Sequence, residues 1–140
     1  MVNRQLIENK LAQLAGYFAD LIESQDVEQK EYLADKKTQR YVERTLQLAI
    51  ECCLDIGNHL IADNNWREPI NNKDVFAVLE ENRVISSPLL PDLGKMAQFR
   101  NVLVHDYARV EPEIIYNILQ NNVADFQRFI GEINEALKNL

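Results

Sequence analysis

The sequence has 140 residues, a formal net charge of −7, 46% hydrophobic residues and 26% charged residues. That length suffices for one domain with one core, so residues 1–140 are predicted to form a single domain. Four glycines and four prolines are too few for a β-sandwich or barrel, which needs a turn every ~8–12 residues. The acidic balance excludes a protein that binds nucleic acid indiscriminately through an excess of Lys and Arg. Taken alone, it slightly favours a protein partner over a polynucleotide.

Neither a signal peptide nor a membrane span is predicted. The first eight residues carry charges where a signal peptide has its apolar stretch, and no run approaches the ~18 apolar residues that cross a bilayer. Cys52 and Cys53 are adjacent in a helical pattern, so they point about 100° apart and cannot pair with each other in an ordinary disulfide. We interpret both as core residues of a cytoplasmic protein in a reducing compartment.

Apolar residues at steps of three and four predict helices along most of the chain. The first helix is expected over residues 3–24, and a polar connection over 26–30 follows it. The second is expected over residues 35–63 and has the most continuous apolar stripe. That stripe comprises Val42, Leu46, Ala49, Ile50, Cys53, Ile56, Leu60 and Ile61.

Three further helices are expected in the second half of the chain. Asn72 is the predicted N-cap of a short helix over residues 73–82. Ser86-Ser87-Pro88 resembles a capping sequence with proline in the first turn of the next helix, over 89–103. Glu111-Pro112 opens a last helix that reaches Leu137. The fold class is therefore all-α, an up-and-down bundle of four to five helices.

Only two histidines, His59 and His105, are present, so a site that titrates near neutral pH must use one or both of them, or neither. His105 lies in a polar cluster unlike the rest of the chain. The cluster comprises Arg100, Asn101, His105, Asp106, Tyr107 and Arg109.

The spacing in this cluster limits what it can do. Asn101 and His105 are four residues apart and share a helix face, whereas Arg100 and His105 are about 140° apart on an ideal helix. Arg100 and His105 can share one phosphate only if the helix loosens near its end, between Val104 and Arg109, or if the long Arg100 side chain swings round. An arginine fork binds phosphate, and imidazole can exchange a proton with a ribose 2′-hydroxyl or a leaving 5′-oxygen. Spacing alone favours the plainer alternative of solvated charges and a histidine that caps a helix end.

The stretch Arg100-x4-His105-x-Tyr107 resembles the R-x4-H-x-Y motif of HEPN ribonucleases, specifically the HepT-like toxins. The whole sequence of residues 99–107, including the polar residue directly after the arginine, is similar to that of the family. Residues 42–59 resemble the family's second helix, and residues 85–100 resemble the segment that leads into the motif in that family. The likeness covers most of the chain in the same order.

The resemblance implies a metal-independent endoribonuclease without a cofactor, which cleaves tRNA or mRNA by 2′-hydroxyl attack. Arg100 would hold the scissile phosphate, Asn101 would orient the arginine or the substrate, and His105 would act as acid and base. HEPN ribonucleases work as homodimers that join two motifs in one cleft. A dimer would supply both a base and an acid, since each motif offers one histidine.

The resemblance also implies a toxin–antitoxin pair. Tyr107 matches the tyrosine that an MntA-type nucleotidyltransferase antitoxin AMPylates in this family, and a negatively charged nucleotide there would block the cleft and repel RNA. A non-catalytic helical module that binds a nucleotide or the nucleotidyltransferase is the alternative. The chain is not itself a nucleotidyltransferase, because it lacks the Gly-Ser loop, the strand pattern and the paired acidic residues of those enzymes.

Two helix faces outside the motif are also candidates. Glu51, Asp55 and His59 recur at steps of four, which suits an acidic support for Arg100 or a plain polar face. A metal site is disfavoured, because three or four converging ligands are needed and one imidazole is available.

The second of these faces is basic. Lys36, Arg40 and Arg44 form a stripe that could follow an RNA backbone or an acidic antitoxin surface, or could be a solvated face paired with Glu43. Trp66, in a predicted loop, could stack on a base or act as a hydrophobic lid.

Overall fold

The computed structural model describes residues 2–140, and these residues contain helices and no strand. The α-helices are α1 (Arg4–Ser24), α2 (Gln29–Ala34), α3 (Lys36–Asp63), α4 (Asn72–Glu81), α5 (Leu90–His105), α6 (Pro112–Asn121) and α7 (Ala124–Leu137), with a 3-10 helix, η1 (Tyr107–Arg109), after α5. The predicted all-helical class is confirmed. The helices outnumber the predicted four to five because the last predicted helix is divided in two and a short helix, α2, lies between the first two predicted helices.

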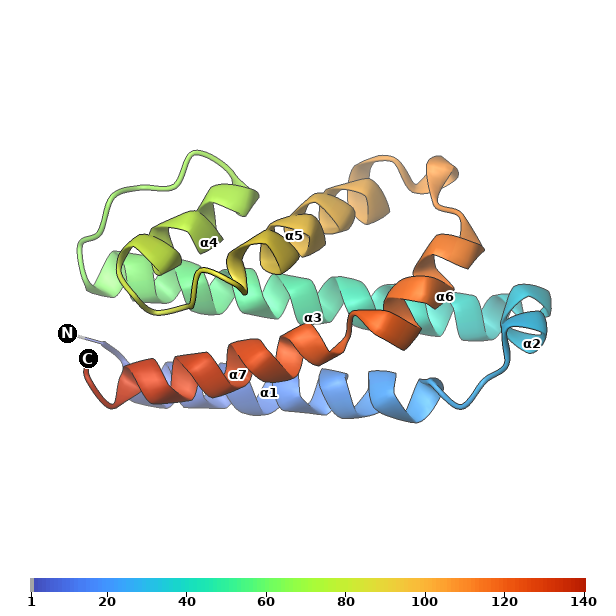
Figure 1. Cartoon of the computed structure of the whole chain (residues 1–140), viewed down its shortest axis with the longest axis horizontal. Helices are drawn as coiled ribbons and strands as arrows, with labels where there is room; N and C mark the ends of the chain where they lie inside the picture. The colour runs from blue at the N-terminus through green and yellow to red at the C-terminus, as the bar shows by residue number, and fades with distance from the viewer. Residues whose placement is uncertain (1) are drawn as a thin grey trace.

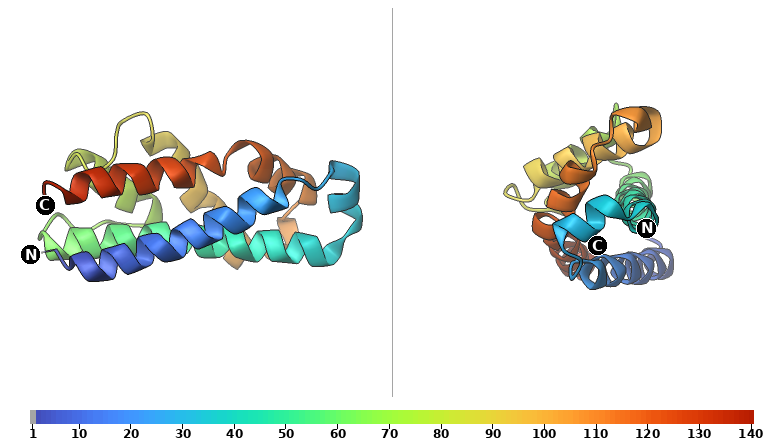
Figure 2. Two further views of the ribbon diagram at one scale, coloured as in Figure 1. Left: turned by 90° about the horizontal axis from the view of Figure 1, so that it is seen from below. Right: turned by 90° about the vertical axis from the view of Figure 1, so that its right-hand side faces the viewer.

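Four long segments run up and down the molecule: α1, α3, α5 and the α6–α7 pair (Figure 1). Helix α1 packs along α3, and α7 packs on α1, so both termini lie at one end. The short α2 turns the chain at the opposite end, where α6 covers it (Figure 2). Helix α4 packs against both α3 and α5.

Helix α3 is the spine of the bundle. It contacts α1, α2, α4, α5, α6 and α7, and its 28 residues extend about 42 Å at the usual rise of an α-helix. Asp35 caps its first turn by accepting hydrogen bonds from the backbone N–H groups of Lys37 and Thr38. Every residue of the predicted stripe, from Val42 to Ile61, is buried. The polar side chains beside that stripe are thereby held in fixed positions along the molecule.

The two cysteines are core residues, as predicted. Cys52 and Cys53 are free thiols, buried in α3. Burial raises the pKa of Cys52 to about 11 and the pKa of Cys53 well above its usual value. Neither thiol is therefore activated for chemistry.

Two predicted capping roles are wrong. Asn71, not Asn72, caps α4, because its extended backbone lets its Oδ1 accept from the N–H of Asp74 at 2.8 Å. Ser86 does not cap α5. Its N–H and hydroxyl both donate to the Glu132 carboxylate, which ties this turn to α7. Helix α5 instead starts at Leu90 without a side-chain cap.

The last predicted helix is two helices. Around Asn122 the backbone changes to i→i−3 hydrogen bonds, from Asp125 N–H to the Asn122 carbonyl and from Phe126 N–H to that of Val123. This tightened turn lets α6 pack on α2 while α7 packs on α1. An unbroken apolar stripe does not reveal such a change of direction, because both halves bury the same type of residue.

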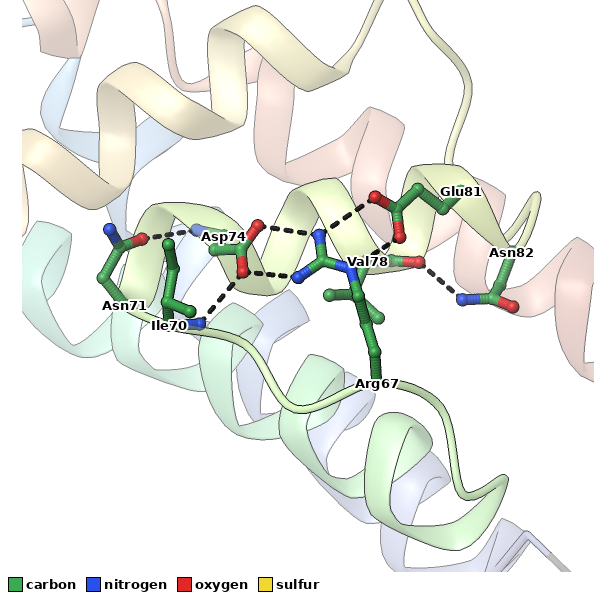
Figure 3. A network of polar contacts seen from close by, with 7 residues as sticks. All are labelled: Arg67, Ile70, Asn71, Asp74, Val78, Glu81 and Asn82. Atoms are coloured by element: carbon green, nitrogen blue, oxygen red, sulfur yellow. Dashed lines mark hydrogen bonds and ion pairs between the residues drawn. The ribbon is translucent and has the colours of Figure 1, made fainter.

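Arg67 fastens the loop between α3 and α4 (Figure 3). Its guanidinium donates to Asp74 at 2.7 and 2.9 Å and to Glu81 at 2.9 Å, and the N–H of Ile70 also donates to Asp74. The ion pairs lower the pKa of Asp74 to about 2 and also lower that of Glu81. The loop is thus held along α4, whose first residue, Asn72, lies beside α5.

None of the helices described has the length and apolar character that crossing a membrane requires.

Gly57 is predicted to control the distance between α3 and α4. A Cβ at this position would lie 2.6 Å from a methyl carbon of Val75 and 3.2 Å from Leu79, both buried in α4. We expect Gly57→Ala to lower the free energy of unfolding by about 1–3 kcal/mol in urea titrations, as overpacked cores do. Gly16→Ala is the matched control, because no atom lies within 4 Å of its added Cβ, and it should gain up to about 1 kcal/mol from helix propensity. Equal effects of the two substitutions would contradict this account.

Candidate active site: the end of α5 against α3

Arg100 is held in place by α3. Its Nε donates to Oε2 of Glu51 at 3.0 Å, its Nη2 forms an ion pair with the same oxygen at 2.9 Å, and Gln47 also donates to that oxygen. Its Nη1 lies 3.4 Å from Oδ1 of Asn101, which also accepts from Asn72 of α4. The guanidinium is therefore held along one edge, by its Nε and Nη2. The Arg100 side chain still has exposed surface, since 22% of it is accessible to solvent.

A polar cavity of about 270 Å³ opens beside this guanidinium. It lies between α3, α4 and α5 and is lined by Glu51, Leu54, Asp55, Asn58, Asn72 and Arg100. Asp55 lines the cavity without contacting Arg100 and pairs with Lys10 of α1 at 3.7 Å. Of the two acidic residues considered as supports for Arg100, Glu51 alone makes the contact.

His105 is the last residue of α5 and is exposed, and its side chain has no hydrogen-bond partner among residues 2–140. The helix keeps its regular pattern up to this point, because the N–H of Asp106 still bonds to the carbonyl of Val102 at 3.0 Å. The helix ends between Val104 and Arg109, as predicted, with its last residue at His105 and η1 after it. The turn from Arg100 to His105 stays regular, so this helix end does not bring the two side chains together. The two side chains therefore stay about 140° apart around the helix.

Tyr107 is tied back to α3 as well. Its hydroxyl donates to Oε1 of Glu43 at 2.7 Å, and the guanidinium carbon of Arg40 lies 5.3 Å from the ring centre. Burial, together with the neighbouring Glu43 carboxylate, raises the pKa of Tyr107. The residue as a whole remains 44% exposed.

The other candidate residues lie apart from these contacts. Lys36 and Arg44 are exposed on α3, so Arg40 is the one member of the basic stripe that reaches the motif. Within residues 2–140 no group of three or more His, Cys, Asp or Glu side chains is placed to hold a metal, and His59 is half-buried. Trp66 packs against the core from its loop.

The chain matches the family model described as ribonuclease HepT-like over residues 7–133. The chain belongs to the ribonuclease HepT-like family.

Among curated proteins, this HepT-like chain is 36% identical to the mRNA nuclease HepT of Shewanella oneidensis over 88 residues, which cover 63% of this chain and 66% of the relative. It is 23% identical to the tRNA nuclease HepT of Aphanizomenon flos-aquae over 135 residues, 96% of this chain and 92% of the relative.

Among solved structures, the HepT-like chain resembles the tri-AMPylated HEPN toxin of Shewanella oneidensis in complex with its MNT antitoxin. The TM-score is 0.85 at 30% identity, and the match covers 96% of this chain and 99% of that one. A toxin–antitoxin complex with AMP-PNP matches with a TM-score of 0.87 at 29% identity, over 94% and 99% of the two chains.

Three residues of this HepT-like site were not assigned to it from the sequence. Glu43 was considered only as a partner of the basic stripe, Asn72 only as a helix cap, and Gln47 not at all. Glu43 and Tyr107 are 64 residues apart in the chain, so spacing could not reveal their contact. The one local signal was a carboxylate at the edge of an otherwise apolar stripe, two turns before Glu51.

The Arg100–Glu51 pair is predicted to couple α5 to α3. Because both side chains are partly buried and the contact is two-pronged, a double-mutant cycle of Arg100→Ala and Glu51→Ala should give a coupling free energy of about 1 kcal/mol in urea. The cycle of Lys138→Ala and Glu135→Ala, an exposed pair at 3.1 Å, is the control and should couple more weakly. A coupling no larger than that of the exposed pair would contradict the positioning role of Glu51.

Proposed function

We propose that this protein is the toxin of a HEPN/nucleotidyltransferase pair, an endoribonuclease that cuts RNA by attack of the ribose 2′-hydroxyl. The observation that carries the proposal is the arrangement of the motif. Arg100 is fixed edge-on by Glu51, whereas His105 stands unpaired on the same helix. Membership of the ribonuclease HepT-like family and relatives named as mRNA and tRNA nucleases support it.

Each residue has a definite part in this reaction. Glu51 and Asn101 orient the Arg100 fork, whose free surface binds the scissile phosphate and stabilises the charge that develops there. The imidazole of His105 takes the 2′-hydroxyl proton or gives a proton to the 5′-oxygen leaving group. These two groups provide phosphate binding and proton transfer without a metal ion.

The working unit in this proposal is a homodimer. Arg100 and His105 diverge around a regular helix, and one histidine cannot be base and acid in the same step. A second copy that faces the end of α5 supplies the complementary groups. Apolar side chains are exposed on this part of the molecule at Val102, Val104 and Ile114, which are 37%, 38% and 48% accessible. Contact between two copies would cover them.

RNA and the antitoxin are the proposed partners. On a body with a net charge of −7, the exposed stripe of Lys36, Arg40 and Arg44 is a basic surface on α3. Arg40 connects that stripe to the motif through Tyr107, so a phosphate backbone or an acidic antitoxin face that lies along the stripe leads to the end of α5.

The nucleotidyltransferase antitoxin is proposed to silence the toxin by AMPylation of Tyr107. Tyr107 lies two residues beyond His105 and is exposed to solvent. One or more adenylates on this oxygen would fill the space beside His105 and repel the RNA backbone. The solved Shewanella toxin in its tri-AMPylated form is the precedent.

His105→Ala and Arg100→Ala are each expected to reduce RNA cleavage by about 100-fold or more while helicity is retained, because each removes a group that acts in the transition state. The measurement is the cleavage rate of total RNA and tRNA on denaturing gels, with and without EDTA, which should have no effect. His59→Ala, the other histidine, is the control and should cleave at the wild-type rate. Cleavage that persists without His105, or that stops with chelator, would overturn the mechanism.

If the wild-type protein gives no fragments at any excess, the alternative of a non-catalytic module that binds a nucleotide or the antitoxin is favoured. The acidic composition, with a pI of about 4.8, is the observation behind that alternative.

Co-expression with the nucleotidyltransferase antitoxin and ATP is expected to add the mass of one or more adenylates to the peptide that carries Tyr107. Peptide mapping by mass spectrometry locates the adduct. Tyr107→Phe should abolish it, and Tyr116→Phe, whose hydroxyl donates to a backbone carbonyl, should leave it unchanged. An adduct on Tyr116 or elsewhere, with Tyr107 unmodified, would refute this mode of regulation.

A further inference from the structure

The hydroxyl of Tyr107 and the carboxylate of Glu43 form a close pair in which the tyrosine is exposed and the carboxylate is buried. The donor–acceptor distance is 2.7 Å, and the Glu43 side chain is only 8% exposed, whereas Tyr107 as a residue is 44% exposed. A reagent can therefore approach the tyrosine from solvent while its hydroxyl proton points at a carboxylate in the protein interior.

Arg40, which lies on α3 like Glu43, contacts both members of the Tyr107–Glu43 pair. Its Nη1 lies 3.2 and 3.3 Å from the two oxygens of Glu43, and its guanidinium lies over the Tyr107 ring. A buried carboxylate is stable in its charged form only with partners such as these. Arg40 thus places a positive charge directly against the Glu43 carboxylate.

We propose that Glu43 is the proton acceptor for the nucleotidylation of Tyr107, so that the toxin chain itself supplies the base for its own inactivation. This inference rests on the proposed modification of Tyr107. In the step, the phenolic oxygen attacks the α-phosphorus of a nucleoside triphosphate held by the antitoxin. The new bond joins that oxygen to phosphorus, the bond to the β-phosphate oxygen breaks, and pyrophosphate leaves. The phenolic proton passes to Oε1 of Glu43 and from there to solvent or pyrophosphate.

The chemistry of tyrosine explains why an acceptor is needed. A phenol with a pKa near 10 is almost wholly protonated at neutral pH, and burial together with Glu43 raises the pKa of Tyr107 further. The proton must therefore leave during the attack, to a base within about 2.6–3.2 Å of the oxygen. Glu43 meets that distance. Tyr116, by contrast, donates at 2.8 Å to the backbone carbonyl of Val27, which does not accept a proton.

Glu43→Gln tests the inference, because glutamine keeps the size and the hydrogen-bond acceptor of the side chain but cannot take the proton. We expect the rate of Tyr107 adenylation, measured by intact mass under single-turnover conditions with the antitoxin and ATP, to fall by about 100-fold at pH 7. Glu111→Gln removes an equal charge near the motif, at an exposed position, and should leave the rate unchanged. Glu43→Asp retains a carboxylate and should recover part of the loss.

The pH profile separates proton transfer from a merely structural role. In the Glu43→Gln protein the rate should climb with pH at a slope of about one in log units, as hydroxide replaces the missing base, and should approach the wild-type rate above pH 9. A constant deficit at all pH values, or a wild-type rate at pH 7, would overturn the role of Glu43. Absence of adduct on Tyr107 of the wild-type chain would overturn the proposed modification itself, and this inference with it.

Discussion

Two carboxylates on one helix hold the motif segment at both of its ends. Glu51 of α3 binds Arg100 at one end, and Glu43 of the same helix binds Tyr107 at the other. Glu43 and Glu51 are eight positions apart, which corresponds to about 12 Å along the helix axis. The segment from Arg100 to Tyr107 lies antiparallel against that length. Because α3 is buried by contacts with the other helices, the core of the bundle sets the position of the motif.

His105 lies between these two anchors and is attached to neither. The imidazole of His105, on the last turn of α5, is exposed and in the proposed reaction would act on RNA. The guanidinium of Arg100, by contrast, is already oriented by Glu51. This division explains why the proposed reaction needs a second copy of the chain. Arg100 and His105 point in different directions from one helix. In the proposed dimer, two copies of α5 face each other, so that the arginine of one copy and the histidine of the other would form a complete site.

The same anchors connect the proposed catalysis with its proposed regulation. In this proposal, Glu51 orients Arg100, the group that would bind phosphate, and Glu43 faces the Tyr107 oxygen that would receive the nucleotide. Both act from the polar edge of α3, next to an apolar stripe that cannot shift without loss of packing. In this scheme the modified tyrosine does not need to propagate a conformational change, since a charged nucleotide two residues from His105 blocks RNA directly.

Local patterns and long-range contacts were not equally accessible to prediction from the sequence. The periodic apolar stripes gave the helices and the buried cysteines, because burial leaves a direct mark at helical spacing. The break between α6 and α7, the cap at Asn71 and the turn at Ser86 were missed, because each depends on how neighbouring helices meet. Glu43 and Asn72 were not assigned to the site for a related reason, since their partners are 64 and 29 residues away in the chain. The motif itself was found through its resemblance to a family, and the contact between Arg100 and Glu51 was foreseen only as one of several roles for that face.

The central claim is the attack of a ribose 2′-hydroxyl, assisted by Arg100 and His105. The most direct measurement is the chemistry of the ends that the purified protein leaves on a defined RNA, determined by mass spectrometry of the fragments. The account predicts a 2′,3′-cyclic phosphate, or the phosphate formed when it opens, on the upstream fragment and a 5′-hydroxyl on the downstream one. A 3′-hydroxyl paired with a 5′-phosphate would mean that water, and not the ribose, attacks the phosphorus, and would contradict it.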